Sequence, residues 1–253
     1  MTTLPECFGI IPARYQSKRF PGKPLADLHG KPMFWHVYSQ ARKCVHFSHI
    51  VLATDDQRIF SAAEALQVPV VMTDADHPSG TDRALEAATS LGVPEAAVVV
   101  NIQGDEPLIA PDMLNKLISP FVSADVRVTT LARKLSPEEA DNPDRVKVVI
   151  AEDGRALYFS RSKIPYYRSE RDQTFLGHIG LYAFRMETLR TFQELGPGRL
   201  ETAESLEQLR LLENGLNIHV VVTDHSSIGV DTPADLEKVA GLMNNQYPIT
   251  NDQ

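Results

Sequence analysis

Short apolar runs alternate with helical patterns through the first half of this chain, and this alternation constrains the fold more than any other feature. The apolar runs are short enough for buried strands and lie at 8–12, 49–54, 68–72 and 97–102. The helical patterns lie at 32–44, 56–67, 81–91 and 112–121, and Asp55 is the expected N-cap of the second of them. Strand patterns followed each time by helix patterns predict a parallel sheet with helices on both faces.

The second half of the chain is richer in strand patterns. They lie at 126–133, 146–151, 155–160, 175–185 and 218–223. The turn residues 152–154 join two of these strands and predict a β-hairpin. One long helix is predicted over 200–214, with Gly215 closing its carboxyl end, and a last helix is predicted to begin near Pro233. The residues from 244 onward are expected to form a loose polar tail.

Composition excludes several classes of protein. Hydrophobic residues make up 43% of the 253 residues, which is enough for a full core and argues against disorder. The net charge of −8 argues against a general nucleic-acid binder. No apolar run is long enough to span a membrane, and the amino-terminal residues show no secretion signal. Cys7 and Cys44 lack metal-binding spacing and indicate a reducing compartment, so we expect a soluble cytoplasmic protein.

A basic loop follows the first predicted strand. It carries Arg14, Lys18, Arg19 and Lys23, which form a local positive island in an acidic chain. Open α/β sheets bind ligands at the carboxyl ends of their strands, and such an island suits a triphosphate. Gly22 would allow close approach of the backbone to a ligand. A solvated surface loop is the alternative.

Two familiar phosphate motifs are absent from this loop. A P-loop needs Gly four residues before its Gly-Lys pair and Ser or Thr after it, and here Ser17 and Pro24 stand at those places. No Gly-x-Gly-x-x-Gly follows the strand either. The sequence therefore argues against an ordinary P-loop ATPase and against a dinucleotide oxidoreductase.

Two carboxylates follow predicted strands and are candidate magnesium ligands. Asp105 lies in Gln103-Gly-Asp105, at the carboxyl end of the 97–102 strand, and Asp231 follows the last strand. Mg²⁺ in nucleotide sites takes one or two carboxylates together with water and phosphate oxygens. The alternatives are that Asp105 caps a turn and that Asp231 caps the helix beginning at Pro233.

Other candidates are less informative when the residues are considered alone. The loop 79–83 could present backbone N–H groups to a ligand or only cap a helix. His178 and Tyr182 lie four residues apart on one strand and so share a face. The pattern by itself favours structural roles for these two residues and for Arg161, Glu207 and Gln208.

Several short motifs recur together in one family of enzymes. They are Ile10-Ile-Pro-Ala-Arg-Tyr15, Arg19-Phe-Pro-Gly-Lys-Pro-Leu25, Ser79-Gly-Thr81 with Arg83, Val100-Asn-Ile-Gln-Gly-Asp-Glu-Pro107, Leu157-Tyr-Phe-Ser-Arg161, Ile164-Pro165, His178-Ile-Gly-Leu-Tyr182, Leu206-Glu-Gln-Leu-Arg210 and Gly229-Val-Asp-Thr-Pro233. From Phe8 to about Val239, the chain thus resembles the 3-deoxy-manno-octulosonate (Kdo) cytidylyltransferases, or CMP-Kdo synthetases.

The resemblance implies a fold and a set of partners. The fold would be a Rossmann-like α/β nucleotidyltransferase, three-layer α/β/α, with a mixed, mostly parallel sheet. Residues 1–253 would form a single domain, with a smaller β-rich sugar-binding and dimerisation lobe within about 126–200. The protein would be a cytoplasmic homodimer without nucleic-acid partners or membrane insertion.

The resemblance also implies roles for individual residues. The catalytic set would be Arg14, Lys23, Asp105 and Asp231, and the two aspartates would hold Mg²⁺. The nucleotide CTP would be bound by Ala13, Arg14, Arg19, Lys23, Ser79, Gly80, Thr81, Arg83 and Gln103. The sugar acid would be bound by Gln103, Arg161, His178, Tyr182, Glu207 and Gln208.

The implied reaction is CTP + Kdo → CMP-Kdo + diphosphate, for lipopolysaccharide biosynthesis. Three departures from familiar members, at Asp74, Gly177 and Ser205, leave open the same reaction on 8-amino-3,8-dideoxy-manno-octulosonate. Another nucleotidyltransferase acting on an acidic sugar is a further alternative. A non-catalytic nucleotide-binding module is a third, and the retained carboxylates and basic loop argue against it.

Overall fold

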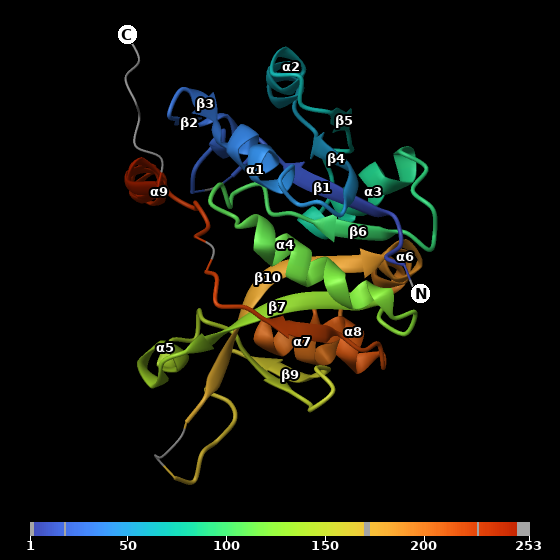
Figure 1. The fold of residues 1–253 in the computed structure, drawn as a ribbon, viewed down its shortest axis with the longest axis vertical. Helices are drawn as coiled ribbons and strands as arrows, with labels where there is room; N and C mark the ends of the chain where they lie inside the picture. The colour runs from blue at the N-terminus through green and yellow to red at the C-terminus, as the bar shows by residue number, and fades with distance from the viewer. Residues whose placement is uncertain (1–2, 18, 170–172, 227, 247–253) are drawn as a thin grey trace. The chain divides into compact units, whose positions relative to one another are not determined.

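The computed structural model describes residues 3–17, 19–169, 173–226 and 228–246 (Figure 1). Lys18 of the basic loop and residues 247–253 lie outside these ranges, and the start of the predicted tail, 244–246, belongs instead to the last helix. The chain forms two compact units, each built from separate stretches. We call the first the basic-loop unit (within 8–92, 101–112 and 227–253) and the second the β10 unit (within 1–7, 93–100 and 113–226).

Parallel strands form the centre of the basic-loop unit. They are β1 (Cys7–Ala13), β4 (Phe47–Thr54) and β5 (Val70–Met72), in the order β1-β4-β5. Its helices are η1 (Lys23–Leu25), α1 (Met33–Ala41), α2 (Gln57–Ala65), α3 (Gly80–Ser90) and α9 (Pro233–Gln246). A separate antiparallel pair consists of β2 (Asp27–Leu28) and β3 (Lys31–Pro32). The β1 strand is apolar because six of its seven residues are buried in the core.

The N-cap of α2 differs from the prediction. Asp56, rather than Asp55, caps this helix, and its carboxylate accepts a hydrogen bond from Arg58 N at 2.9 Å. Asp55 instead forms an ion pair of 2.9 Å with Arg83, which is 2% exposed. Either aspartate could cap the helix. The buried guanidinium of Arg83 pairs with Asp55, so Asp56 is the residue left to cap it.

Mixed strand pairing characterises the β10 unit. Its strands are β6 (Val98–Asn101), β7 (Val128–Leu135), β8 (Lys147–Ile150), β9 (Ala156–Ser160), β10 (Phe175–Arg185) and β11 (His219–Val222). The order is β11-β7-β10-β6, with β7 antiparallel to β10 and parallel to β11. The predicted hairpin is confirmed, since β8 and β9 pair in antiparallel fashion. The helices are α4 (Pro111–Ile118), η2 (Ser119–Val122), α5 (Pro137–Asp141), α6 (Met186–Glu194), α7 (Arg199–Glu204) and α8 (Leu209–Glu213).

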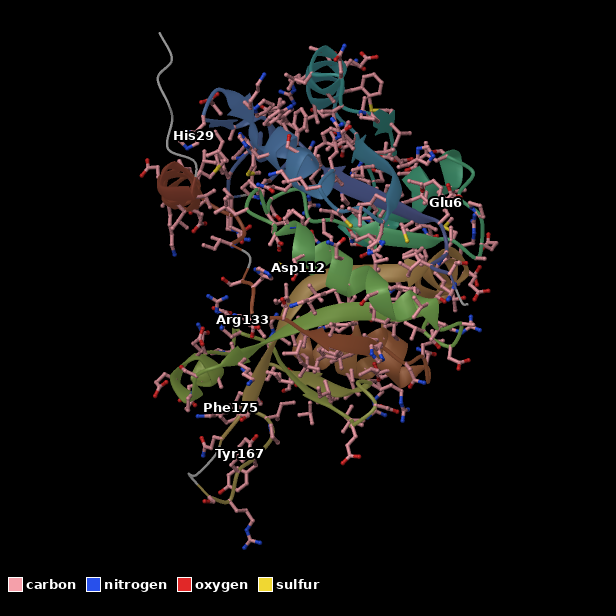
Figure 2. All side chains as sticks on the ribbon, in the orientation of Figure 1. Glu6, His29, Asp112, Arg133, Tyr167 and Phe175 are labelled. Carbon is pink, nitrogen blue, oxygen red and sulfur yellow. The ribbon has the colours of Figure 1, made fainter. Side chains whose placement is uncertain are left out.

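An apolar cluster lies beside the start of β10 in the same unit. Leu135, Ala140 and Phe175 are buried there, and Tyr167 packs against them. The rings of Tyr167 and Phe175, labelled in Figure 2, meet edge to face with centroids 5.3 Å apart. A Cβ added to Gly177 would lie 2.7 Å from a methyl group of Leu135, so this cluster occupies the space that a side chain at 177 would need.

The prediction of one helix over 200–214 is wrong. Two short helices, α7 and α8, replace it, and Ser205 ends α7 in the left-handed conformation at φ 53°. Few non-glycine residues adopt this conformation, so an amphipathic pattern does not reveal it. The break places Glu207 and Gln208 in the short connection between two helices instead of on one regular helical face.

The α/β class with a mixed, mostly parallel sheet and flanking helices is confirmed. No helix among the described residues is long and apolar enough to cross a membrane. The single domain with a smaller lobe within 126–200 stays a prediction.

Candidate active site

A pocket of about 860 Å³ lies in the basic-loop unit, at the carboxyl end of β1. The predicted residues that line it are Ala13, Arg14, Arg19, Lys23, Ser79, Gly80, Arg83, Gln103, Asp105 and Asp231. Thr81 is absent from the lining, and its hydroxyl lies 3.4 Å from the side-chain nitrogen of Asn101. The pocket therefore gathers residues from four separate stretches of the chain, at 13–23, 79–83, 103–105 and 231.

Main-chain hydrogen bonds bring the two predicted metal ligands together. Ile102 N donates to Ile10 O at 2.9 Å, which aligns the following residues with the end of β1. Val230 N donates to Asp105 O at 2.9 Å, which brings the segment before α9 to the same place. Between them lies Gly104, where a Cβ would collide with the carbonyl oxygen of Pro12. Glycine is thus needed for this close approach.

The carboxylates of Asp105 and Asp231 converge on one ammonium group. Lys23 Nζ lies 2.7 Å from Asp105 Oδ2 and 3.5 Å from Asp231 Oδ1. Arg19 also pairs with Asp231, at 2.9 Å. The Lys23 side chain is only 14% exposed, whereas that of Arg19 is 67% exposed, so Lys23 makes the less screened ion pairs.

The structure also decides whether Asp231 caps the last helix. Thr232 and Asp235 cap α9: Asp235 Oδ2 accepts from Thr232 N at 2.9 Å, and Thr232 Oγ1 accepts from Asp235 N at 3.3 Å. The Asp231 carboxylate, by contrast, is turned toward Arg19 and Lys23. The Asp105 carboxylate likewise faces Lys23. Both carboxylates therefore face cationic groups at the pocket, and Asp231 does not serve as the cap of α9.

The donor set fits a magnesium ion bound together with a nucleotide. Two carboxylates that reach one Nζ can also reach one cation, and Mg²⁺ completes its shell with water and phosphate oxygens. No group of three or more His, Cys, Asp or Glu residues that could hold a metal occurs among the described residues. Water and phosphate oxygens would complete the ligands of a cation held by Asp105 and Asp231.

Contacts on both sides hold the basic loop. Gly22, at φ 71°, donates from its N to Tyr15 O at 2.9 Å and closes the loop. The Tyr15 ring packs against Gly22 and lies under the Arg58 guanidinium, whose carbon is 3.3 Å from the ring centroid. Asp56 in turn holds Arg58 at 2.7 Å. Neither Tyr15 nor Arg58 was predicted as a site residue, since nothing in the sequence links α2 to this loop.

The 79–83 segment has a structural role and a position in the pocket. Ser79 caps α3, and its hydroxyl lies 3.3 Å from Asp82 N and 2.7 Å from Asp82 Oδ2. The buried Arg83 donates to Asp55, to Thr73 Oγ1 at 2.5 Å and to Asp74 O at 3.1 Å. The N-cap interpretation is therefore correct. These contacts also hold the wall of the pocket.

The sugar-site candidates other than Gln103 lie in the β10 unit. His178 Nε2 is 2.9 Å from Tyr182 Oη and 3.0 Å from Thr130 Oγ1. Burial lowers the pKa of His178 to about 3 and raises the pKa of Tyr182 well above its usual value. Both side chains are therefore neutral near pH 7. They form a polar pair that shares one face, as predicted.

The break between α7 and α8 follows Glu204 and Ser205, which contact Arg161, and it precedes Glu207 and Gln208. Arg161 Nε donates to Glu204 O at 2.7 Å, and Arg161 Nη2 lies 3.4 Å from Ser205 O. Gln208 is 7% exposed, and its side-chain nitrogen lacks a hydrogen-bond partner among the described residues. A buried amide without a partner is costly, which is typical of a group that awaits a ligand.

Comparison with known proteins agrees with this geometry. The family described as cytidylyltransferase matches residues 8–218. A 3-deoxy-manno-octulosonate cytidylyltransferase of Nitratidesulfovibrio vulgaris is 60% identical over 247 residues, which cover 96% of this chain and 98% of that protein. The enzyme of the same name from Lawsonia intracellularis is 53% identical, with 94% of each chain covered.

Solved structures give the same result. A CMP:2-keto-3-deoxy-manno-octonic acid synthetase complexed with CTP superposes with a TM-score of 0.91 and 43% identity, covering 96% of this chain and all of that one. A cytidylyltransferase from Leptospira borgpetersenii, at 15% identity and a TM-score of 0.64, shares the fold over 95% of this chain and 87% of that one.

The fold and the pocket are those of a nucleotidyltransferase, a class of enzyme that transfers a nucleotidyl group. At 60% identity over nearly its whole length, the chain belongs to the 3-deoxy-manno-octulosonate cytidylyltransferases.

Proposed function

We propose that this enzyme transfers the cytidylyl group of CTP to Kdo and releases diphosphate. The observation that carries this proposal is the convergence of Lys23, Asp105 and Asp231 in a pocket lined by further basic residues. In the reaction, the anomeric hydroxyl oxygen of Kdo forms a bond to the α-phosphorus of CTP. The bond from that phosphorus to the diphosphate oxygen breaks, diphosphate leaves, and the hydroxyl proton passes to solvent.

The triphosphate would lie along the basic loop. Arg14, Arg19 and Lys23 offer cationic donors where charge spreads over phosphate oxygens. Lys23 now pairs with two carboxylates, and a bound cation at those carboxylates would free its ammonium for phosphate. Such a cation would reduce the repulsion between the negative charges of Asp105 and Asp231 and those of the triphosphate.

We propose Mg²⁺ as this cation, held by Asp105 and Asp231. A bound Mg²⁺ would neutralise charge on the attacking and leaving oxygens. The protein would also contribute to catalysis by positioning. The close approach of Gly104 to Pro12 and the hydrogen bond from Val230 N to Asp105 O fix where the two carboxylates lie.

The sugar acid would be held by groups of the β10 unit. Arg161 offers a planar guanidinium for the sugar carboxylate. Neutral His178 and Tyr182 offer hydrogen bonds to hydroxyl groups without a charge. The buried side-chain nitrogen of Gln208 would gain an acceptor. These residue types suit a polyhydroxy carboxylic acid.

Three local observations favour Kdo over its 8-amino analogue. A side chain at Gly177 would point into the apolar cluster with Leu135. The Asp74 carboxylate accepts a hydrogen bond from Asp76 N at 2.9 Å. Ser205 ends α7 and brings no charge. Gly177 and Ser205, the two of these positions that lie in the β10 unit, therefore offer no carboxylate to an ammonium group.

We further propose that the enzyme acts in the cytoplasm as a homodimer and supplies lipopolysaccharide biosynthesis. The homodimer and the pathway rest on the family resemblance. The absence of a membrane-spanning helix among the described residues is compatible with this setting.

Release of diphosphate from CTP, measured with a panel of sugar acids, tests the proposed function. We expect release with Kdo and magnesium, CMP-Kdo as the product by mass, and little release with sugars that lack the carboxylate. Release with another acidic sugar and none with Kdo would reassign the substrate. Binding of CTP without any turnover would instead support a nucleotide-binding module.

A further inference from the structure

We propose that Glu204 is a positioning residue that sets Arg161 for the sugar carboxylate. This inference rests on the proposed function and deepens it. Glu204 is the last residue of α7, and the amphipathic pattern treats it as one of several charges on a helix. Its contacts are with the end of β9 in the same unit.

Both oxygens of the Glu204 carboxylate accept hydrogen bonds from the segment that carries Arg161. Glu204 Oε1 accepts from Ser160 Oγ at 2.6 Å, and Oε2 accepts from Arg161 N at 2.9 Å. Ser160 is 3% exposed, so the first of these bonds is shielded from water. The two bonds fix the position of the main chain at Arg161. Burial raises the pKa of Glu204, but the hydrogen bonds outweigh it, so this pKa lies below its usual value.

Carbonyl groups at the end of α7 fix the guanidinium group of Arg161. Arg161 Nε donates to Glu204 O at 2.7 Å, and Nη2 donates to Ser205 O at 3.4 Å. The left-handed Ser205 turns these carbonyl groups away from helix hydrogen bonding, so they can accept from the guanidinium. Glu204 therefore holds Arg161 at its backbone through its carboxylate and at its guanidinium through its carbonyl.

These contacts leave part of the guanidinium for a ligand. A guanidinium carries five N–H groups. The described residues accept from three of those of Arg161, at Glu204 O, Pro143 O and Ser205 O. One N–H on each Nη then remains for a ligand, and two guanidinium N–H groups can engage a carboxylate in a bidentate manner.

The buried Lys147 holds the main chain of Arg161 at a second point, its carbonyl oxygen. Lys147 is fully buried, and its Nζ donates to Arg161 O at 2.5 Å and to Asn142 O at 3.1 Å. Burial lowers the pKa of Lys147, and the charge of Glu204 opposes this shift. The peptide groups on both sides of Arg161 are thus held, one by Glu204 and one by Lys147.

The test compares Glu204→Ala with Glu204→Gln. KM for Kdo, KM for CTP, kcat and the thermal unfolding midpoint are measured for each variant. Glu204→Ala is expected to raise KM for Kdo at least about tenfold and to change KM for CTP less than about twofold. Glu204→Gln should restore most of the Kdo affinity, because its amide can accept from Arg161 N and donate to Ser160 Oγ.

Glu139→Gln is the matched control. Glu139, on α5, also accepts from a backbone N, that of Ser136, and from an arginine, but that arginine is Arg133 and not Arg161. Both KM values should be unchanged in this variant. If Glu204→Ala fails to fold, Ser160→Ala removes one of the two carboxylate contacts and should raise KM for Kdo at least about threefold.

The outcomes separate this inference from the proposed function. Absence of CMP-Kdo synthesis by the unaltered enzyme would overturn both. If Arg161→Ala loses Kdo saturation while Glu204→Ala retains it, only the positioning role is overturned. Equal losses for CTP and Kdo in Glu204→Ala, or no recovery in Glu204→Gln, would also overturn it.

Discussion

The ammonium nitrogen of Lys23 lies 2.7 Å from a carboxylate oxygen of Asp105, although 82 positions separate the two residues in the chain. Asp231, a further 126 positions along, lies 3.5 Å from the same nitrogen. The partly buried ammonium group of Lys23 thus lies where two acidic groups meet. The following predictions start from that point.

Asp105→Asn should fold normally and lose nearly all turnover, because a neutral amide is a poorer magnesium ligand than a carboxylate. The variant is checked by circular dichroism and by initial rates over a magnesium titration. Asp153→Asn is the control, since its carboxylate pairs with Arg155 in a surface turn. Turnover near that of the unaltered enzyme at saturating magnesium would refute the ligand assignment.

Lys23→Ala should weaken CTP binding or slow transfer by at least about tenfold. A charge-assisted contact to phosphate contributes on the order of 1.5–3 kcal/mol. Removal of the lysine also leaves Asp105 and Asp231 facing each other without their shared cation. Calorimetry of CTP binding and steady-state rates measure the effect, with the surface variant Lys43→Ala as control. Unchanged CTP affinity and kcat would return the basic loop to the role of a solvated surface loop.

Arg161→Ala and His178→Ala should keep their affinity for CTP and lose saturation by Kdo. Both residues belong to the β10 unit, whereas the pocket lined by the basic loop belongs to the other unit. Calorimetry with CTP and initial rates over a Kdo titration separate the two effects. An equal loss of CTP binding would instead assign these residues to the nucleotide site or to folding.

The stability of the protein should fall in acid partly because of His178. Its pKa is about 3 in the folded chain and near 6.5 when unfolded. Between these values the unfolded chain binds the extra proton, so the free energy of unfolding decreases as pH falls from about 6.5 toward 3. The contribution of one such proton is at most about 1.4 kcal/mol per pH unit.

Urea unfolding at pH values between about 7 and 4.5 measures this effect, and His178→Gln is the comparison. The variant should show a shallower loss of stability with acid, because glutamine does not titrate. Parallel slopes for the two proteins would contradict the assignment of this acid sensitivity to His178.

Kdo should be preferred over its 8-amino analogue by more than about tenfold in kcat/KM, which is worth about 1.4 kcal/mol. The reason is that Gly177 and Ser205, the two unusual positions that lie in the β10 unit, offer no carboxylate to an ammonium group. Both sugars are supplied at equal concentration, and the CMP-sugar products are separated by mass. A preference of the same size for the amino sugar would reverse the assignment.

Local patterns predicted most strands and helices because burial and backbone preference act over a few residues. The apolar strand β1, the hairpin of β8 and β9 and the helices α2 and α3 all lie where the pattern placed them. Local patterns do not predict the structure correctly where two neighbouring residues suit one role, or where a residue adopts an unusual backbone conformation. Asp55 and Asp56 are adjacent candidates for one cap, and Ser205 adopts a conformation that its side chain does not favour.

The sequence by itself determined the class of fold and singled out the acidic and basic residues of the pocket. It could not determine their pairing, because that depends on contacts between distant segments. Only the folded chain shows that Lys23 joins Asp105 to Asp231, and that Thr232 and Asp235 leave Asp231 free of the capping role. Only the folded chain places Glu204 against Ser160 and Arg161. Hydrogen bonds and ion pairs of this kind form between atoms that meet after the backbone has folded, and a linear pattern carries no record of which atoms those are.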